Sequence, residues 1–168
     1  GGYLPEAMLN YLARLGWSHG DEELFSLDQM VAWFDGSHLS RSPAQWDAAK
    51  LGWVNAHYIK QADDARLAGL VAQQFARRGV QPPAAERLAA MCALFKDRCG
   101  TTVELADWLQ MYVTPVTAPA EELAAHLTDA VRPALVALRD RLAACPWDKA
   151  GIAQALKETL AEHKLKMP

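Results

Sequence analysis

Alanine and leucine dominate this sequence, and their excess constrains the possible folds more than any motif does. The 168 residues include 31 alanines and 22 leucines, whereas valine, isoleucine and threonine together number only 17. Helices favour Ala and Leu, while strands need β-branched and aromatic side chains to fill a pleated surface. The composition therefore excludes an all-β domain, disfavours a parallel α/β sheet and predicts an all-α fold.

Overall composition excludes several classes of protein. Apolar residues make up 51% of the chain and charged residues 22%, so it can bury a core and is not intrinsically disordered. No apolar run approaches the ~20 residues that span a bilayer, and no basic-then-apolar leader opens the chain. The net charge of −3 does not point to a nucleic-acid partner. We expect a cytoplasmic protein without a membrane partner.

The cysteines and the two ends add further expectations. Cys92, Cys99 and Cys145 include no CxxC pair, which argues against a disulfide framework or a zinc site and favours a reduced compartment. The chain begins at Gly1 without a Met and stops at Pro168 just after a helical pattern. We interpret both ends as cuts in a longer protein.

Helix-start signals recur along the chain, each a capping side chain or a proline followed by apolar residues at helical spacing. They lie at Pro5, at Ser26 with Gln29, at Ser42-Pro43-Ala44-Gln45, at Asp63, at Thr101 with Glu104, and at Asp148. In the third of these, Ser42 is predicted as the cap and Pro43 as the first helical residue. Gly52 then leaves open whether one helix or two short ones follow.

Two proline-rich breaks suggest how the helices are grouped. Gln81-Pro82-Pro83 interrupts one helical pattern, and Thr114–Pro119, with two prolines and two threonines, is the best linker. Arg132-Pro133 is expected to separate two later helices. We predict three helical subdomains: residues 1–62, 63–117 and 118–168. Residues 1–60 carry a net charge of −3 and the later segments are neutral, so local patches there must supply any phosphate binding.

No catalytic or metal motif is found. None of the five histidines pairs at HxxxH or HExxH spacing, and no cysteine lies three or four residues from a histidine. GxxxxGK[ST], GxGxxG and GxSxG are all absent. Cys99 could have a lowered pKa at a helix start, but a buried thiol is the favoured interpretation. We therefore predict no catalytic residue, no metal ligand and no cofactor held by these residues.

The six tryptophans could stack nucleobases, but tryptophan at helical spacing is more often part of a core. We predict core positions for them, including Trp46 and Trp53, together with Tyr58. The basic side chains cluster only weakly, and a solvated helix face explains each cluster.

Two stretches, however, resemble a known family. Gly2-Tyr3-Leu4-Pro5-Glu6-Ala7-Met8-Leu9-Asn10-Tyr11-Leu12, continuing to Leu15-Gly16-Trp17-Ser18, resembles the region after the second ATP-binding signature loop of bacterial glutamyl-tRNA synthetases. Ser40-Arg41-Ser42-Pro43-Ala44-Gln45-Trp46-Asp47, followed by Lys50-Leu51-Gly52-Trp53-Val54-Asn55-Ala56-His57-Tyr58-Ile59, resembles the stem-contact segment of that family. Order and spacing agree in both blocks. Arg98-Cys99 with Thr101 and Glu104 is a weaker third match.

The resemblance implies stacked helical lobes that hold tRNA-Glu at its stem and anticodon. The whole protein would be a class I glutamate–tRNA ligase that uses ATP and Mg²⁺ to attach glutamate to tRNA, and it would act as a monomer. Neither ATP-binding signature of the family occurs here, so this chain alone would be inactive. A tRNA-binding module needs shape and a few well-placed cations rather than a high net charge.

The resemblance also implies contact residues. Arg41, Lys50 and Lys60 would meet phosphate or ribose, and Asn55 and His57 lie in the same segment. Arg98, Gly100 and Thr101 form a turn that would approach the third anticodon base, with Arg98 as the contact and Thr101 as a helix cap. Some members of the family place an arginine in this turn to reject one tRNA class, so Gly100 favours a tolerant enzyme that does not discriminate.

Two other classes of function remain as alternatives. The acidic first 60 residues and the neutral remainder would also suit a helical protein-interaction module with no RNA role. A free-standing enzyme would need converging titratable groups, which the sequence does not show.

Overall fold

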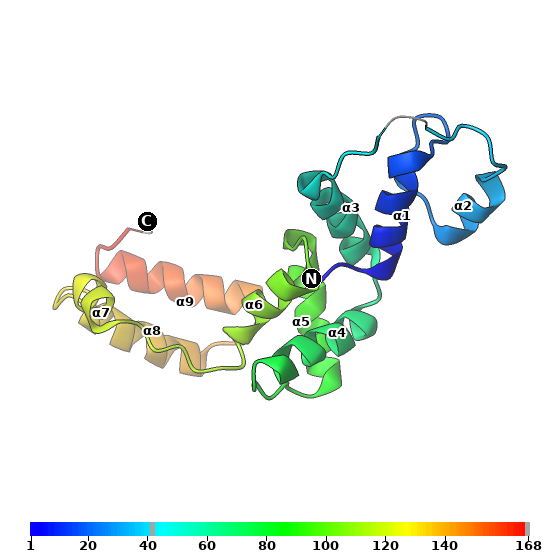
Figure 1. Cartoon of the computed structure of the whole chain (residues 1–168). Helices are drawn as coiled ribbons and strands as arrows, with labels where there is room; N and C mark the ends of the chain where they lie inside the picture. The colour runs from blue at the N-terminus through cyan, green and yellow to red at the C-terminus, as the bar shows by residue number, and fades with distance from the viewer. Residues whose placement is uncertain (41–42, 167–168) are drawn as a thin grey trace. The chain divides into compact units, whose positions relative to one another are not determined.

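The computed structural model describes residues 1–40 and 43–166, and in these ranges the chain is helical with no strand (Figure 1). Trp17 and Leu39 form an isolated antiparallel bridge. The predicted all-α fold is confirmed. No helix in these ranges is both long and apolar enough to cross a membrane.

The chain forms two compact units, Gly1–Val116 and Thr117–Pro168. Their junction falls within the predicted linker at Thr114–Pro119, which is non-helical. The finer division into three subdomains stays a prediction.

The first unit contains six α-helices and one 3-10 helix among the described residues. These are α1 (Pro5–Gly16), α2 (Leu27–Trp33), α3 (Ala48–Gln61), α4 (Asp64–Arg77), α5 (Ala85–Phe95), η1 (Lys96–Arg98) and α6 (Thr102–Gln110). α1 packs against α3, while α4 packs against both α5 and α6. Buried side chains from these helices form one apolar core, which includes Ile59, Leu67, Phe75 and Leu105.

Most predicted helix starts are confirmed. Pro5 begins α1, and Ser26 with Gln29 forms a complete capping box at α2. The side chains of Asp63 and Thr101 cap α4 and α6 by accepting bonds from the backbone three residues on. Local side-chain chemistry was therefore sufficient to locate these starts.

The predicted helix start at Ser42–Gln45 is wrong. Residues 43–47 are not helical, and α3 begins at Ala48 with Asp47 as its cap. The tertiary contact explains the shift, because the backbone N–H of Asp47 donates to the Tyr11 hydroxyl at 2.6 Å. Ser42 itself lies outside the described residues. α3 continues through Gly52 as a single helix, with Leu51 and Val54 buried.

The second unit contains α7 (Ala120–His126), α8 (Arg132–Ala144) and α9 (Lys149–Glu162). Pro133 lies in the first turn of α8, so the break precedes Arg132 instead of falling at Arg132-Pro133. The predicted cap of α9 at Asp148 is confirmed. α8 packs against α9, and the buried residues of the pair are small: Ala134, Ala155 and Thr159.

Candidate nucleic-acid interface

Lys50 lies in the first turn of α3 and is already engaged in the structure. Its Nζ forms an ion pair with Glu23 at 2.7 Å and sits 4.5 Å from the centre of the Trp53 ring, as in a cation–π contact. Arg14 pairs with the same carboxylate at 3.3 Å. The hydrogen bond from Lys50 is the largest influence that lowers the pKa of Glu23. A phosphate at Lys50 would therefore compete with Glu23.

The other predicted contacts of the stem segment differ in exposure. Lys60 is exposed in the last turn of α3, and no ion pair among the described residues includes it. His57 is half-buried, with its ring edge-on to Tyr58 at 5.6 Å between centroids. Arg41 lies outside the described residues.

Asn55 has no exposed side-chain surface through which to touch a nucleic acid. It is 0% exposed, and its Oδ1 accepts a bond from the backbone N–H of Leu4 at 2.7 Å. Its Nδ2 donates to the carbonyl oxygens of Gly2 and Gly100. Asn55 therefore joins three segments of the first unit and positions the turn that carries Gly100.

That turn runs from Arg98 to Thr101 and contains the remaining predicted contacts. Arg98 is exposed at the end of η1. The N–H of Gly100 donates to Glu104 at 2.7 Å, and the N–H of Glu104 donates to the Thr101 hydroxyl at 3.1 Å. The turn is therefore held rigid at the start of α6, with the Arg98 side chain free to reach outward.

The N-terminal segment also contacts this turn, through Gly2. The N–H of Thr102 donates to the Gly2 carbonyl at 2.9 Å, and Gly2 has a φ of +88°. A Cβ at Gly2 would lie 2.9 Å from the Val103 side chain. Glycine is therefore required here both by the backbone conformation and by the close approach.

The prediction that the tryptophans are core residues is wrong for most of them. Trp17 is buried, but Trp46, Trp53, Trp108 and Trp147 are exposed. Helical spacing shows which side chains share a face, but not whether another element covers that face. Tyr58 does pack, since its hydroxyl bonds to Phe25 and Asn10 and burial raises its pKa.

Two of the three cysteines are buried thiols. All three are free, and Cys92 and Cys99 are buried. Burial raises the pKa of each of these two thiols to about 11, so neither is a thiolate at neutral pH. Among the described residues, no three His, Cys, Asp or Glu side chains lie where they could hold a metal ion.

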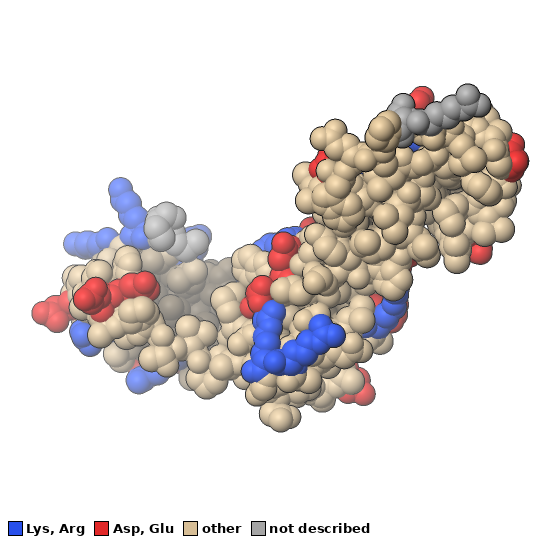
Figure 2. Space-filling model, in the orientation of Figure 1, with Lys and Arg blue, Asp and Glu red and all other residues tan. Residues whose placement is uncertain are grey.

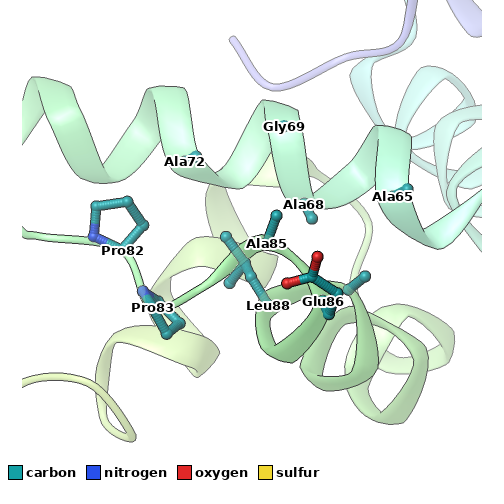
Figure 3. A pocket seen from close by; sticks show the side chains of 10 residues that line it. Ala65, Ala68, Gly69, Ala72, Pro82, Pro83, Ala85, Glu86 and Leu88 are labelled. Carbon is teal, nitrogen blue, oxygen red and sulfur yellow. The ribbon is translucent and has the colours of Figure 1, made fainter.

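An apolar groove of about 640 Å³ lies between α4 and the start of α5. Figure 3 shows Ala65, Gly69 and Ala72 along α4, opposite Pro82 and Pro83. Glu86 is the one ionisable side chain among its lining residues. Such a groove lacks the converging polar groups of a catalytic site.

Surface charge is mixed. In the view of Figure 2, basic side chains gather over the region of α4 to α6, next to acidic ones, and broad areas carry neither charge. Any RNA contact on this side would depend on individual cations and not on a uniformly basic face.

Comparison with family models identifies two segments. The model described as "Anticodon binding domain" matches residues 66–168. The model described as "tRNA synthetases class I (E and Q), catalytic domain" matches residues 1–53.

Curated relatives match almost the whole chain. The glutamate–tRNA ligase of Leptothrix cholodnii is 62% identical over 168 residues, and that of Paracidovorax citrulli is 60% identical over 169 residues. Each alignment covers 99% of this chain, but only 36% and 35% of the respective relative. The chain thus spans about a third of the length of the relatives that it matches.

Solved structures share the fold. The glutamate tRNA ligase of Elizabethkingia meningosepticum, crystallised in complex with its amino acid, has a TM-score of 0.82 at 21% identity. The glutamate–tRNA synthetase of Elizabethkingia anophelis has a TM-score of 0.78 at 22% identity. Both alignments cover 98% of this chain, and they cover 33% and 32% of those structures.

The resemblance to glutamyl-tRNA synthetases that residues 2–18 and 40–59 carry is therefore confirmed, and it extends over the whole chain. The chain belongs to the anticodon-binding domain family, in the form found in glutamate–tRNA ligases.

Proposed function

We propose that this chain holds a tRNA at its stem and anticodon as part of a glutamate–tRNA ligase. The observation that carries the proposal is the match of residues 66–168 to the anticodon-binding domain model. The catalytic-domain model matches only residues 1–53, so this chain supplies binding and not the chemical step.

The geometry of the first unit supports a joint role for its two candidate contact regions. Asn55 of α3 holds the carbonyl of Gly100, which places the stem-contact helix next to the turn from Arg98 to Thr101. The buried side-chain amide of Asn55 thereby sets the distance between α3 and this turn. We assign Asn55 a positioning role and assign the RNA contacts to exposed side chains.

Three exposed or partly exposed cations would meet the tRNA backbone. Lys60 and Arg98 project without an ion pair among the described residues, and Lys50 would exchange Glu23 for phosphate. His57 lies on the same face of α3 as Lys50. We keep Arg41 as a further candidate, and we keep Gly100 and Thr101 as the backbone of the anticodon-side turn.

For the whole protein we propose ATP-dependent attachment of glutamate to tRNA-Glu, with Mg²⁺, by a cytoplasmic monomer. ATP and Mg²⁺ belong to the catalytic domain of such an enzyme. Gly100 supports a tolerant enzyme that does not discriminate between tRNA classes. Residues 1–62, 63–117 and 118–168 would act as the stem-contact subdomain and two anticodon-side subdomains.

The test is the salt dependence of binding to a tRNA-Glu transcript. Affinity should fall as salt rises, because each phosphate contact releases condensed counterions. Lys60→Ala and Arg98→Ala should each weaken binding and lower the slope of log K against log salt by about 1.

Arg87→Ala is the matched control, because Arg87 is exposed on α5 and lies outside the proposed contact regions. Its binding and slope should equal those of the wild type. The proposal fails if the chain binds no tRNA at low salt while the intact ligase binds it.

One surface favours a protein contact as a second candidate function. Val31 of α2 and Phe34, which follows its last residue, are exposed and line an apolar hollow of about 370 Å³ with Ala13, Trp17 and Met30. A contiguous exposed apolar patch of this kind is typical of protein interfaces. A salt-independent complex that Val31→Asp abolishes, without any loss of RNA binding, would support this role.

A further inference from the structure

Three aromatic rings form a row where α5 and α6 meet. The centroids of Phe95 and Trp108 are 5.9 Å apart with 24° between the ring planes, and those of Phe95 and Tyr112 are 5.4 Å apart. Phe95 packs against the core, whereas Trp108 is 41% and Tyr112 56% exposed. The half-buried Phe95 ring therefore contacts both exposed rings and limits their orientation.

The two exposed rings come from α6 and from the turn that follows it: Trp108 lies on α6, and Tyr112 lies in the turn after Gln110. Glu104, which bonds to Gly100, is followed four residues later by Trp108, and Tyr112 follows after another four. Glu104 and Trp108 are four residues apart on α6 and therefore lie one above the other on the helix. Trp108 thus lies one helical turn beyond the carboxylate that holds Gly100.

The charges beside the rings are suited to an anionic partner. Arg78 reaches Asp107 at 2.6 Å and Gln110 at 3.0 Å, so its guanidinium stands beside the helix turn that carries Trp108. Glu104 accepts a bond from the Gly100 N–H and Asp107 pairs with Arg78, so these two carboxylates of α6 are engaged. Arg98 is exposed at the end of η1, before α6 begins.

We propose that Trp108 and Tyr112, held by Phe95, form a platform on which unpaired nucleobases of the bound RNA stack. Fixed aromatic faces flanked by cations are the means by which proteins bind single-stranded nucleic acid. A hollow of about 400 Å³ lies at the end of α6, lined by Met111 and Thr114 among others. The inference rests on the proposed function and deepens it by naming a base-binding surface.

The test compares two RNAs on the full chain: a hairpin with the anticodon loop of tRNA-Glu, and a blunt duplex with the same stem. Trp108→Ala should weaken hairpin binding about tenfold or more and leave duplex binding unchanged, because stacking requires an unpaired base. The salt slope should stay as in the wild type, since no phosphate contact is lost. Trp108→Phe should keep most of the affinity.

A second readout reports the stacking itself. 2-Aminopurine placed in the loop should lose fluorescence on binding to the wild type and retain it with Trp108→Ala. Tyr112→Leu, which keeps apolar bulk without a ring, should weaken hairpin binding severalfold. Leu94→Ala is the control, since Leu94 is an exposed apolar residue of α5 without a ring, and it should have no effect.

The outcomes separate this inference from the proposed function. If Trp108→Ala binds the hairpin as the wild type does, the platform is overturned, while tRNA binding by the wild type keeps the proposed function. If Trp108→Ala weakens hairpin and duplex equally, or Trp108→Phe behaves like Trp108→Ala, the ring has a packing role and the platform is again overturned. If the wild type binds neither the hairpin, nor the duplex, nor tRNA-Glu, both proposals fail.

Discussion

The two units of this chain differ in what they bury. In Gly1–Val116 the core contains large side chains with no exposed surface, among them Ile59, Leu67 and Phe75. Among the described residues of Thr117–Pro168 the buried ones are Ala134, Ala155 and Thr159, and Arg141 joins α8 to α9 by a hydrogen bond to Thr159. Buried apolar area stabilises a fold by roughly 25 cal/mol per Å².

The difference separates two ways of building a helical unit. The first unit has a core large enough to hold the turn from Arg98 to Thr101 in one conformation. The second unit depends on a hydrogen-bonded arginine and small side chains, so we expect it to open locally at a lower free energy. Hydrogen exchange should therefore be faster in α8 and α9 than in α4.

The comparison is tested most strongly by the same substitution in each unit. Leu67→Ala in α4 removes a fully buried side chain and should lower the free energy of unfolding by about 3 kcal/mol. Leu160→Ala in α9 removes a half-buried one and should cost about 1 kcal/mol. Urea denaturation followed by circular dichroism measures both. Equal losses would show that the second unit is as tightly packed as the first.

The next largest effect is expected at Asn55. Asn55→Ala leaves the N–H of Leu4 and the carbonyl of Gly100 without this partner and should destabilise the first unit by about 2 kcal/mol. Exchange of the amides near Gly100 should become faster. Thr102→Ala is a milder control, because its hydroxyl makes only a 3.4 Å bond to Gly2. A loss for Asn55→Ala no greater than that for Thr102→Ala would contradict the positioning role.

Arg141 joins α8 to α9 in the second unit, and removing its polar contacts should lower the free energy of unfolding by less than Asn55→Ala does. Arg141 donates to the Thr159 hydroxyl at 3.0 Å and pairs with Glu158 and Glu162. Arg141→Met keeps the aliphatic packing and should cost about 1 kcal/mol, with faster exchange in α8 and α9. Arg139→Met is the matched control, because Arg139 pairs only with its exposed neighbour Asp140. Identical hydrogen-exchange rates in the two variants would show that the Arg141 contacts do not stabilise the packing of α8 against α9.

The smallest effect concerns pH and the Glu6–Arg66 pair of the first unit. The hydrogen bond from Arg66, 2.9 Å between Nη2 and Oε2, lowers the pKa of Glu6 below its ordinary value of 4.5. A carboxylate with a lowered folded-state pKa stabilises the protein above its unfolded pKa, and this contribution is lost as the pH falls through the folded value. Both side chains are partly exposed, so we expect roughly 0.5 kcal/mol.

Denaturation of the wild type and of Glu6→Gln at pH 7 and pH 3 measures this contribution. The two should differ at pH 7 and converge at pH 3. A difference that persists at pH 3 would mean that the glutamine disturbs packing instead of removing an ion pair.

Local chemistry made much of the fold predictable. Ser26, Asp63, Thr101 and Asp148 cap helices where their side chains reach the backbone three residues on, which depends only on neighbours in sequence. The start of α3 could not be predicted in this way. There the Tyr11 hydroxyl, 36 residues away, bonds the N–H of Asp47 and overrides the signal at Ser42–Gln45.

The candidate site was predictable only in part. The candidate residues of residues 40–59 and of the turn at Arg98 could be named from the sequence. The ion pair between Lys50 and Glu23 could not, because nothing in the spacing of these two residues indicates it. Asn55 was grouped with the contact residues, although it is buried between Gly2 and Gly100. The row of Phe95, Trp108 and Tyr112 was missed because exposure depends on which faces other helices cover.

The all-helical class, most helix starts and the resemblance to one family of synthetases follow from residue types and short spacings, because propensity and capping act within a few residues. Contacts between residues far apart in the chain decide which tryptophans are exposed and which cations are paired. They also decide which amide joins α3 to the turn from Arg98 to Thr101. Such contacts arise when helices pack, since burial and pairing are properties of the assembled core.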